Sequence, residues 1–127
     1  MGLIDFSEIN ELNELKKHIM TLELTNENIE YLKNILIECD REALACADKI
    51  NKIWQENPLL SSVNPLFIQS VKLQTIQKSY EGLRNFVTDY LYKNLSSKEF
   101  FELCAEVDGS YEELTSQYVN DDSNLTL

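Results

Sequence analysis

Glycine and proline are scarce in this sequence, with three glycines and two prolines among 127 residues. Sandwiches and barrels of β-strands need such residues at turn after turn, so their scarcity argues against an all-β fold. A chain with few turn residues favours long helices. The length fits one domain, and a hydrophobic content of 43% is ordinary for a globular core.

Signals for export or membrane insertion are also lacking. The chain opens with MGLIDFSEINEL, which carries acids where a signal peptide needs basic residues followed by an apolar run. The longest uncharged run, residues 57–71, contains both prolines and several polar side chains, so it is not expected to span a membrane. We therefore expect a cytoplasmic protein.

Residues that carry common catalytic chemistry are few. The sequence has one histidine, His18, and it has no glycine-rich phosphate loop, Cys-x-x-Cys pair or nucleophile elbow. Glu14 lies one helical turn before His18, so we expect a surface pair rather than a metal or catalytic site. Cys39, Cys46 and Cys104 lie on apolar helix faces, where we expect buried, inert thiols. We expect no enzymatic activity, no cofactor and no metal.

Hydrophobic residues alternate at spacings of three and four along two long segments, 26–57 and 65–95. In the first segment this alternation forms an unbroken seven-residue repeat, which is typical of a helix packed along its length. It runs through Ile29, Leu32, Leu36, Cys39, Ala43, Cys46, Ile50 and Ile53. The second run contains Leu66, Leu73, Ile76, Tyr80, Leu83, Val87 and Tyr90, with Gln69 as its one polar interruption.

The two prolines lie between these segments, in WQENPLLSSVNPLF. Asn57-Pro58 ends the first helix, because proline disfavours the helical conformation in the residue before it. Asn64-Pro65 begins the next helix, with Asn as the cap and Pro at the first helical position. The link is too short to join independent domains, so the two helices are predicted to form an antiparallel hairpin.

Trp54, just before this turn, gives the chain a feature that is similar to the small secreted helical hairpins with a Trp-x-Gly turn. Trp54-Gln55-Glu56 lacks the glycine of that motif, and this chain has further helices at both ends. We expect Trp54 to close the end of the core, with its indole N–H reaching a loop carbonyl.

Two short helices are predicted after the hairpin. Ser96 and Glu99 form a capping box for the first of them, which Gly109 is expected to end. The second is predicted from Ser110 to about Val119.

Together with a first helix that ends near Met20, these segments predict an all-α fold, a four- or five-helix bundle built on the long antiparallel hairpin. Residues 1–119 are expected to form a single helical domain. The remaining segment, residues 120–127, has no hydrophobic periodicity and is predicted to be a flexible acidic tail.

The net charge of −11 is concentrated in the last quarter of the chain. Residues 96–127 contain eight acids and one base, whereas residues 58–95 carry a net charge of +2. This disfavours direct binding of nucleic acid, which needs clustered Lys and Arg, and it favours a basic protein partner. A solvated face that only keeps the protein soluble is the plainer alternative. The residues predicted to bind the partner are the acids and tyrosines Glu102, Glu106, Asp108, Tyr111, Glu112, Glu113 and Tyr118.

Apolar residues outside the predicted seam indicate a second contact surface. Ile37 and Leu44 are seven residues apart on one line, and Phe67 and Tyr92 add further apolar surface. A first helix of about 21 Å is too short to shield the whole hairpin. We expect a second copy of the chain or another protein to cover this strip.

Two classes of function compete. The first is an acidic protein-binding module, such as an immunity-type or phage-type inhibitor or escort of a basic partner protein. The second is a structural helical subunit of a larger assembly, which uses its hairpin for helix packing. We favour the first class. Salt dependence separates the two, because screening weakens charge attraction much more than it weakens helix packing.

Overall fold

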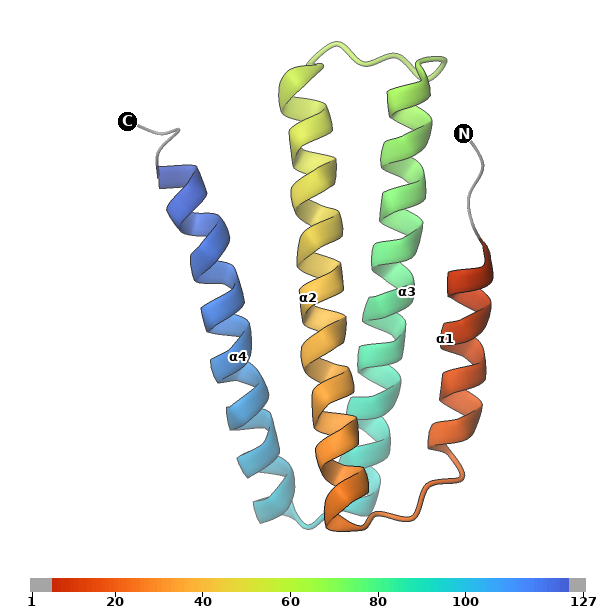
Figure 1. Cartoon of the computed structure of the whole chain (residues 1–127), viewed down its shortest axis with the longest axis vertical. Helices are drawn as coiled ribbons and strands as arrows, with labels where there is room; N and C mark the ends of the chain where they lie inside the picture. Colours follow the sequence, from red (N-terminus) through yellow and green to blue (C-terminus); the bar gives the residue numbers. More distant parts are fainter. Residues whose placement is uncertain (1–5, 124–127) are drawn as a thin grey trace.

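The computed structural model contains four helices, and it describes the backbone of residues 6–123 and the side chains of residues 10–118. The helices are α1 (Phe6–Ile19), α2 (Asn26–Glu56), α3 (Pro65–Asn94) and α4 (Ser97–Ser123). In Figure 1, α2 and α3 form a long antiparallel hairpin, with α1 beside α3 and α4 beside α2. The predicted all-α bundle built on a helical hairpin is confirmed.

The ends of the two long helices follow from local hydrogen bonds. Thr25 caps α2, and its hydroxyl accepts a hydrogen bond from the Asn28 N–H at 3.2 Å. Asn64 caps α3 in the same way, with its Oδ1 accepting from the Leu66 N–H at 2.8 Å. Pro65 is the first residue of α3, where its missing N–H costs no helical hydrogen bond. The predicted reversal at WQENPLLSSVNPLF is therefore confirmed.

The buried face of α3 differs by one residue from the predicted seam at both ends of the helix. Ser70 is fully buried and Gln69 is exposed. The Ser70 hydroxyl donates to the Phe67 carbonyl at 2.7 Å, which satisfies it inside its own helix. Near the other end Leu91 is fully buried, whereas Tyr90 is half-buried and donates its hydroxyl to the Leu22 carbonyl at 2.9 Å. Both the third and the fourth residue after Val87 lie on the same helical face, so periodicity alone could not decide whether Tyr90 or Leu91 is the buried one.

The core lies toward the end of the hairpin away from its loop, where α1 packs on α3 and α4 packs on α2 (Figure 1). Its buried members come from every helix, and they are Ile19, Leu32, Leu36, Cys39, Leu83, Val87, Leu91, Leu103 and Val107. The loop end of the hairpin is covered less. Leu59 and Val63 in the loop are 96% and 85% exposed. The short first helix thus leaves part of the hairpin without a covering helix, as the sequence predicted.

The prediction of two short helices after the hairpin is wrong, because α4 is a single helix. Ser96 caps it as predicted, with its hydroxyl accepting from the Glu99 N–H at 3.2 Å and donating to Glu99 Oε1 at 2.9 Å. Gly109 lies within α4 with a negative φ, so it does not end the helix. A mid-helix glycine costs only about 1 kcal/mol relative to alanine, which packing of Val107 and its neighbours offsets. The helix continues to Ser123, into the segment predicted as a tail, and residues 124–127 lie outside the described part.

Trp54 packs edge-to-face against Phe67 at the loop end of the hairpin, with ring centroids 6.1 Å apart and planes at 82°. The structure thus places Trp54 at the loop end of the hairpin, outside the core cluster described above, so the prediction that it closes the end of that core is not confirmed. Its contact is with an aromatic ring of α3 rather than with a loop carbonyl. This pair joins the last turns of α2 to the first turns of α3.

Truncation of Leu91 tests the observed seam. Leu91→Ala removes a fully buried side chain from the core, and we predict a loss of about 2–5 kcal/mol in the free energy of unfolding. The same deletion at the exposed Leu59 should change it by less than about 0.5 kcal/mol. Urea unfolding followed by circular dichroism measures both. Equal losses in the two variants would contradict the seam described above.

Candidate functional site

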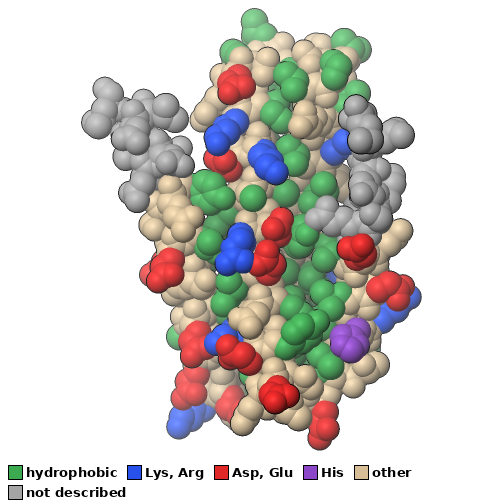
Figure 2. All heavy atoms as spheres, in the orientation of Figure 1, with side chains coloured by type: hydrophobic (Ala, Val, Ile, Leu, Met, Phe, Trp, Pro, Cys, Tyr) green, Lys and Arg blue, Asp and Glu red, His purple; other side chains and the backbone are tan. Residues whose placement is uncertain are grey.

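A cavity of about 390 Å³ lies between α2, α3 and α4. Its apolar wall is formed by small and medium side chains of α2, namely Ala43, Leu44 and Ala47. In Figure 1, α4 diverges from α2 toward its C-terminal end, and in Figure 2 hydrophobic side chains are visible between these helices while acidic ones lie along α4. A volume of this size is within the usual range for small-molecule and side-chain pockets.

A buried ion pair lies in this cavity. Asp40 of α2 is 6% exposed, and its Oδ1 accepts a hydrogen bond from Arg84 Nε of α3 at 2.7 Å. The other oxygen of Asp40, Oδ2, is buried and has no hydrogen-bond partner among the described residues. A buried carboxylate oxygen without a donor costs roughly 1–3 kcal/mol, and more when it is charged. This oxygen is enclosed by the packing of the helices, so the ion pair with Arg84 satisfies only half of the carboxylate.

The cavity carries more negative than positive charge. Glu81 of α3 and Asp108 of α4 line it together with Asp40, and Arg84 is the one cation among its lining residues. Tyr111, which is 42% exposed, stands at the α4 side. The arrangement suits a cationic hydrogen-bond donor better than an anion, because an anion would meet three carboxylates.

Cys39 also lines the cavity, in a form that is chemically inert at neutral pH. Burial, and to a smaller extent the neighbouring Asp40 carboxylate, raise the pKa of its thiol to about 12, although Arg84 opposes the shift. Burial likewise raises the pKa of the half-buried Cys104. Since the thiolate is the nucleophile, neither thiol is activated for covalent chemistry.

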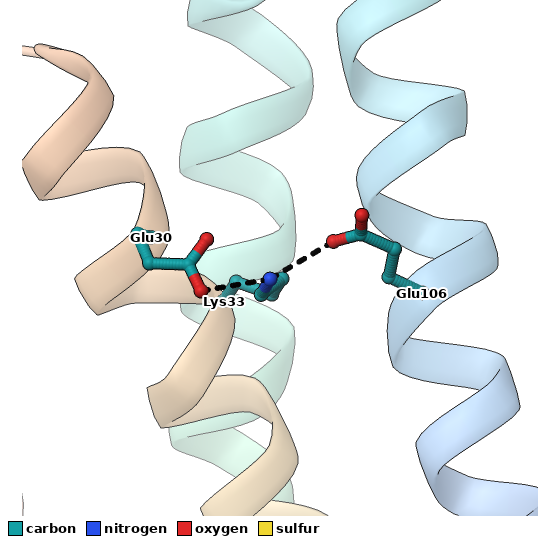
Figure 3. A network of polar contacts seen from close by, with 3 residues as sticks. All are labelled: Glu30, Lys33 and Glu106. Carbon is teal, nitrogen blue, oxygen red and sulfur yellow. Dashed lines mark hydrogen bonds and ion pairs between the residues drawn. The ribbon is translucent and has the colours of Figure 1, made fainter.

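A charge network connects α2 to α4 (Figure 3). Lys33 Nζ lies 2.9 Å from Glu30 Oε1 on its own helix and 2.9 Å from Glu106 Oε2 on α4. Hydrogen bonds to Glu30 and then to Glu106 raise the pKa of Lys33, so it stays charged at neutral pH. Glu106, predicted to bind a partner, thus contacts a lysine of the same chain.

The other predicted acids of α4 lie differently. Glu102, Glu112 and Glu113 are exposed, and their carboxylates have no basic partner in the described part of the chain. Asp108 is also exposed, and it lies at the rim of the cavity. The predicted acids therefore comprise three exposed residues without a basic partner in the described part (Glu102, Glu112 and Glu113), one exposed residue that lines the cavity (Asp108), and one that binds Lys33 of α2 (Glu106).

Of the two predicted tyrosines, Tyr111 joins the cavity and Tyr118 is half-buried near the end of the described side chains. The predicted apolar strip is covered in part, because α4 lies over its line on α2. Ile37 packs against the core and Leu44 lines the cavity. The expectation that this line is uncovered is wrong at Ile37. Sequence spacing identified the line but did not show that a helix of the same chain covers it.

The remaining apolar residues of that strip lie at opposite ends of the molecule. Phe67 is half-buried against Trp54. Tyr92 is 67% exposed and contacts Phe100 edge-to-face, with centroids 5.3 Å apart. Phe101, at 68% exposure, extends this small aromatic cluster at the corner between α3 and α4. These residues do not form one continuous surface with Ile37.

His18 is exposed, as expected, but its predicted partner is engaged elsewhere. Glu14 Oε1 pairs with Lys17 Nζ at 3.2 Å. Between residues 6 and 123, no helix has the length and apolar character required to cross a membrane. In the same part of the chain no three His, Cys, Asp or Glu side chains converge as metal ligands would.

Sequence reasoning missed Asp40 and Arg84, although a signal was present. Asp40 interrupts the apolar line between Ile37 and Leu44. Asp40 lies 16 residues before the end of α2, and Arg84 lies 19 residues after the start of α3. In an antiparallel hairpin these two positions are at nearly the same height. Asp40 is an acid on an apolar line, and it lies opposite one of the two arginines in the sequence. This combination predicts a buried ion pair.

Comparison of the chain with protein-family models, with curated proteins and with solved structures finds no match. The similarity of the Trp54 turn to Trp-x-Gly hairpins therefore stays an analogy of architecture. Function has to be argued from the geometry above.

Breaking the Asp40–Arg84 pair from one side should destabilise the fold. Arg84→Met leaves a buried carboxylate without its donor, and we predict a loss of about 2–3 kcal/mol in the free energy of unfolding, because Arg84 is itself partly exposed. The double variant Asp40→Leu/Arg84→Met should recover most of that loss. Arg41→Met is the matched control, since Arg41 pairs with Glu38 on the surface and should cost less than about 1 kcal/mol. Urea unfolding measures the free energy of unfolding of all three variants. If the double variant loses as much stability as the sum of the two single substitutions, the energetic coupling of Asp40 with Arg84 is contradicted.

The raised thiol pKa predicts slow chemistry and a loss of stability in alkali. In the folded protein Cys39 should resist a disulfide reagent at pH 8 and react only after denaturation. The unfolded thiol ionises near its ordinary pKa of 9.0, whereas the folded one stays protonated to about 12. Stability should therefore be complete below pH 9 and fall as the pH rises from 9 toward 12, by up to about 1.4 kcal/mol per pH unit. The stability of Cys39→Ala should fall less steeply over the same pH range. An equal slope in the two proteins would contradict a raised pKa at Cys39.

Proposed function

We propose that the protein is a non-enzymatic binding module that captures a basic partner protein on the outward face of α4. The observation that carries this proposal is the free acidic face formed by Glu102, Glu112 and Glu113. These carboxylates are exposed and have no basic partner among the described residues. Most of the other acids that the structure describes on α2 and α3 have ion-pair partners, so this face contributes an uncompensated field.

An uncompensated field of one sign acts mainly on association. It raises the rate at which a basic surface meets the acidic one, and it suppresses encounters with acidic proteins and with nucleic-acid phosphates. A basic nuclease or toxin is the kind of partner that such a face attracts and masks, which is the action of an immunity-type inhibitor or escort. The inert thiols Cys39 and Cys104 support a binding rather than a catalytic role.

A structural subunit remains the second candidate, favoured by a different observation. Apolar side chains toward the loop end of the hairpin are exposed, and they are Leu59, Val63, Ile68 and Val71. Helix packing in an assembly, or in a homodimer, would bury them. Both proposals place the protein in an aqueous compartment, which we take to be the cytoplasm.

Charge reversal distinguishes the two candidates. A partner captured from the native host is purified, and its binding kinetics are measured by surface plasmon resonance at several salt concentrations. With Glu102→Lys/Glu112→Lys/Glu113→Lys we predict an association rate at least about tenfold lower at low salt, with the difference shrinking as salt rises. Glu106 is left unchanged because it holds α4 to Lys33.

The control carries the same change of net charge on the opposite side of the molecule. Glu11→Lys/Glu14→Lys/Glu23→Lys changes three exposed residues of α1 and of the connection after it. It should lower the association rate much less than the α4 variant. Equal effects of both variants, or rates that do not depend on salt, would overturn capture by α4 and favour helix packing.

A further inference from the structure

Helix α4 has two segments that meet at Gly109 and are held to the hairpin differently. The proximal segment is residues 97–108, and the distal segment is residues 110–123. We propose that the distal segment opens away from α2 as a unit, through a break of the helix at Gly109, and so uncovers the apolar face of α2 around Leu44. The distal segment is then a built-in cover of a helix-packing surface, a role that goes beyond the proposed capture of a basic partner.

The contacts that hold α4 to the hairpin lie on the proximal segment. Leu103 and Val107 are buried there, and Glu106 binds Lys33 of α2 at 2.9 Å. Among residues 110–118, where the side chains of the distal segment are described, none is buried and none forms an ion pair with α2 or α3. Segments with few buried apolar contacts are the ones that open locally while the rest of a protein stays folded.

The cavity between α2, α3 and α4 lies beneath the start of the distal segment. Asp108 and Tyr111, on either side of Gly109, line it from α4, while Leu44 and Ala47 line it from α2. Its volume is about 390 Å³, and α4 diverges from α2 toward its C-terminal end (Figure 1). Side chains that face such a space lack the dispersion contacts of a packed interface. The distal segment therefore begins over a gap in the packing.

Charge does not hold the distal segment to α2 either. Glu112 and Glu113 lie on this segment, and the sequence from Gly109 to its end has no lysine or arginine. Helix α2 contains seven acids and four bases, so the two elements have net charges of the same sign. Because like charges oppose close approach, the field favours the open arrangement, and it is opposed by half-buried side chains such as Leu114.

Gly109 is the point at which the helix is most easily broken. A Cβ added there would meet nothing within 4 Å, so packing does not require glycine at this position. Glycine stabilises a helix less than any residue other than proline, because it loses more backbone freedom when it is ordered. A bend accounts for glycine here, whereas a close contact does not.

Amide hydrogen exchange of the full-length chain, followed by NMR, tests the opening without a partner. Its outcome is therefore independent of capture by α4. The helical acceptors of amides 113–118 lie at or beyond Gly109, since each helical N–H bonds the carbonyl four residues before it. We predict protection factors for these distal amides that are at least about 100-fold lower than those of the proximal amides 101–108. Equal protection of the two groups overturns the proposal.

Two glycine variants locate the break. Gly109→Ala should raise the protection of the distal amides about fivefold, because alanine favours the helix at that position. Gly82→Ala is the matched control, since it makes the same change in the middle of α3, where the added Cβ meets Lys16 Nζ at an ordinary distance of 3.9 Å. It should leave the distal protection unchanged. Equal effects of the two variants on the distal amides overturn a break at Gly109.

A core variant separates local opening from unfolding of the whole chain. Ile19→Val removes one methyl group from a fully buried side chain of α1, and it should lower the protection of the core amides about fivefold. The distal amides should not change, because their exchange does not require the hairpin to unfold. A parallel fall in both groups of amides overturns the proposal.

Thiol labelling tests the uncovering of α2. Leu44→Cys is combined with Cys104→Ser, which removes a half-buried thiol, and reaction with N-ethylmaleimide is located by mass spectrometry. Cys39, buried on the same helix, is the internal reference. The thiol introduced at position 44 should react at least about 100-fold faster than Cys39. Adding Gly109→Ala should slow this reaction about fivefold, whereas adding Gly82→Ala should not. A labelling rate that is indifferent to Gly109→Ala overturns the uncovering of this face.

Discussion

The packing of α2 against α3 is the interaction on which the other elements depend. These helices of 31 and 30 residues bury Leu36, Leu83 and Val87 between them. In the described part of the chain α1 packs on α3, while α4 packs on α2 and to a smaller extent on α3. Within residues 6–123 the outer helices α1 and α4 do not contact each other and depend on the hairpin for their positions, so any change in the register of the hairpin would displace both of them.

Asp40 and Arg84 introduce a polar constraint into that apolar frame. An ion pair at the same height on two antiparallel helices is satisfied in one register only, whereas apolar side chains tolerate small shifts. We regard this pair as a contributor to the register rather than to net stability, since desolvation of a buried carboxylate offsets much of the gain. Because Arg84 reaches only one oxygen of Asp40, the other oxygen is left buried without a hydrogen-bond partner among the described residues.

Helix α4 serves two surfaces at once. Leu103 and Val107 are buried against the core, and Glu106 binds Lys33, so the inner side of the helix is held by packing and by charge. The acids on its outer side are left to solvent. The last quarter of the chain has eight acids and one base, and it still packs on an acidic protein. It does so because the inner side of α4 contributes apolar contacts and an ion pair, while most of its described acids point to solvent.

Local rules in the sequence determined the helices and the reversal between them. Thr25, Asn64-Pro65 and Ser96 act within their own turns, so their effect on helix ends was predictable, and the strict repeat of α2 required a long packed face. Gly109 shows the limit of such rules, because a helix breaker of about 1 kcal/mol is overridden when a neighbouring turn packs on the core. The pairing of Asp40 with Arg84 and of Lys33 with Glu106 joins residues 44 and 73 positions apart. Only the packing of whole helices brings such residues together, and for that reason the tertiary structure alone decided where the cavity lies and which acids remain free.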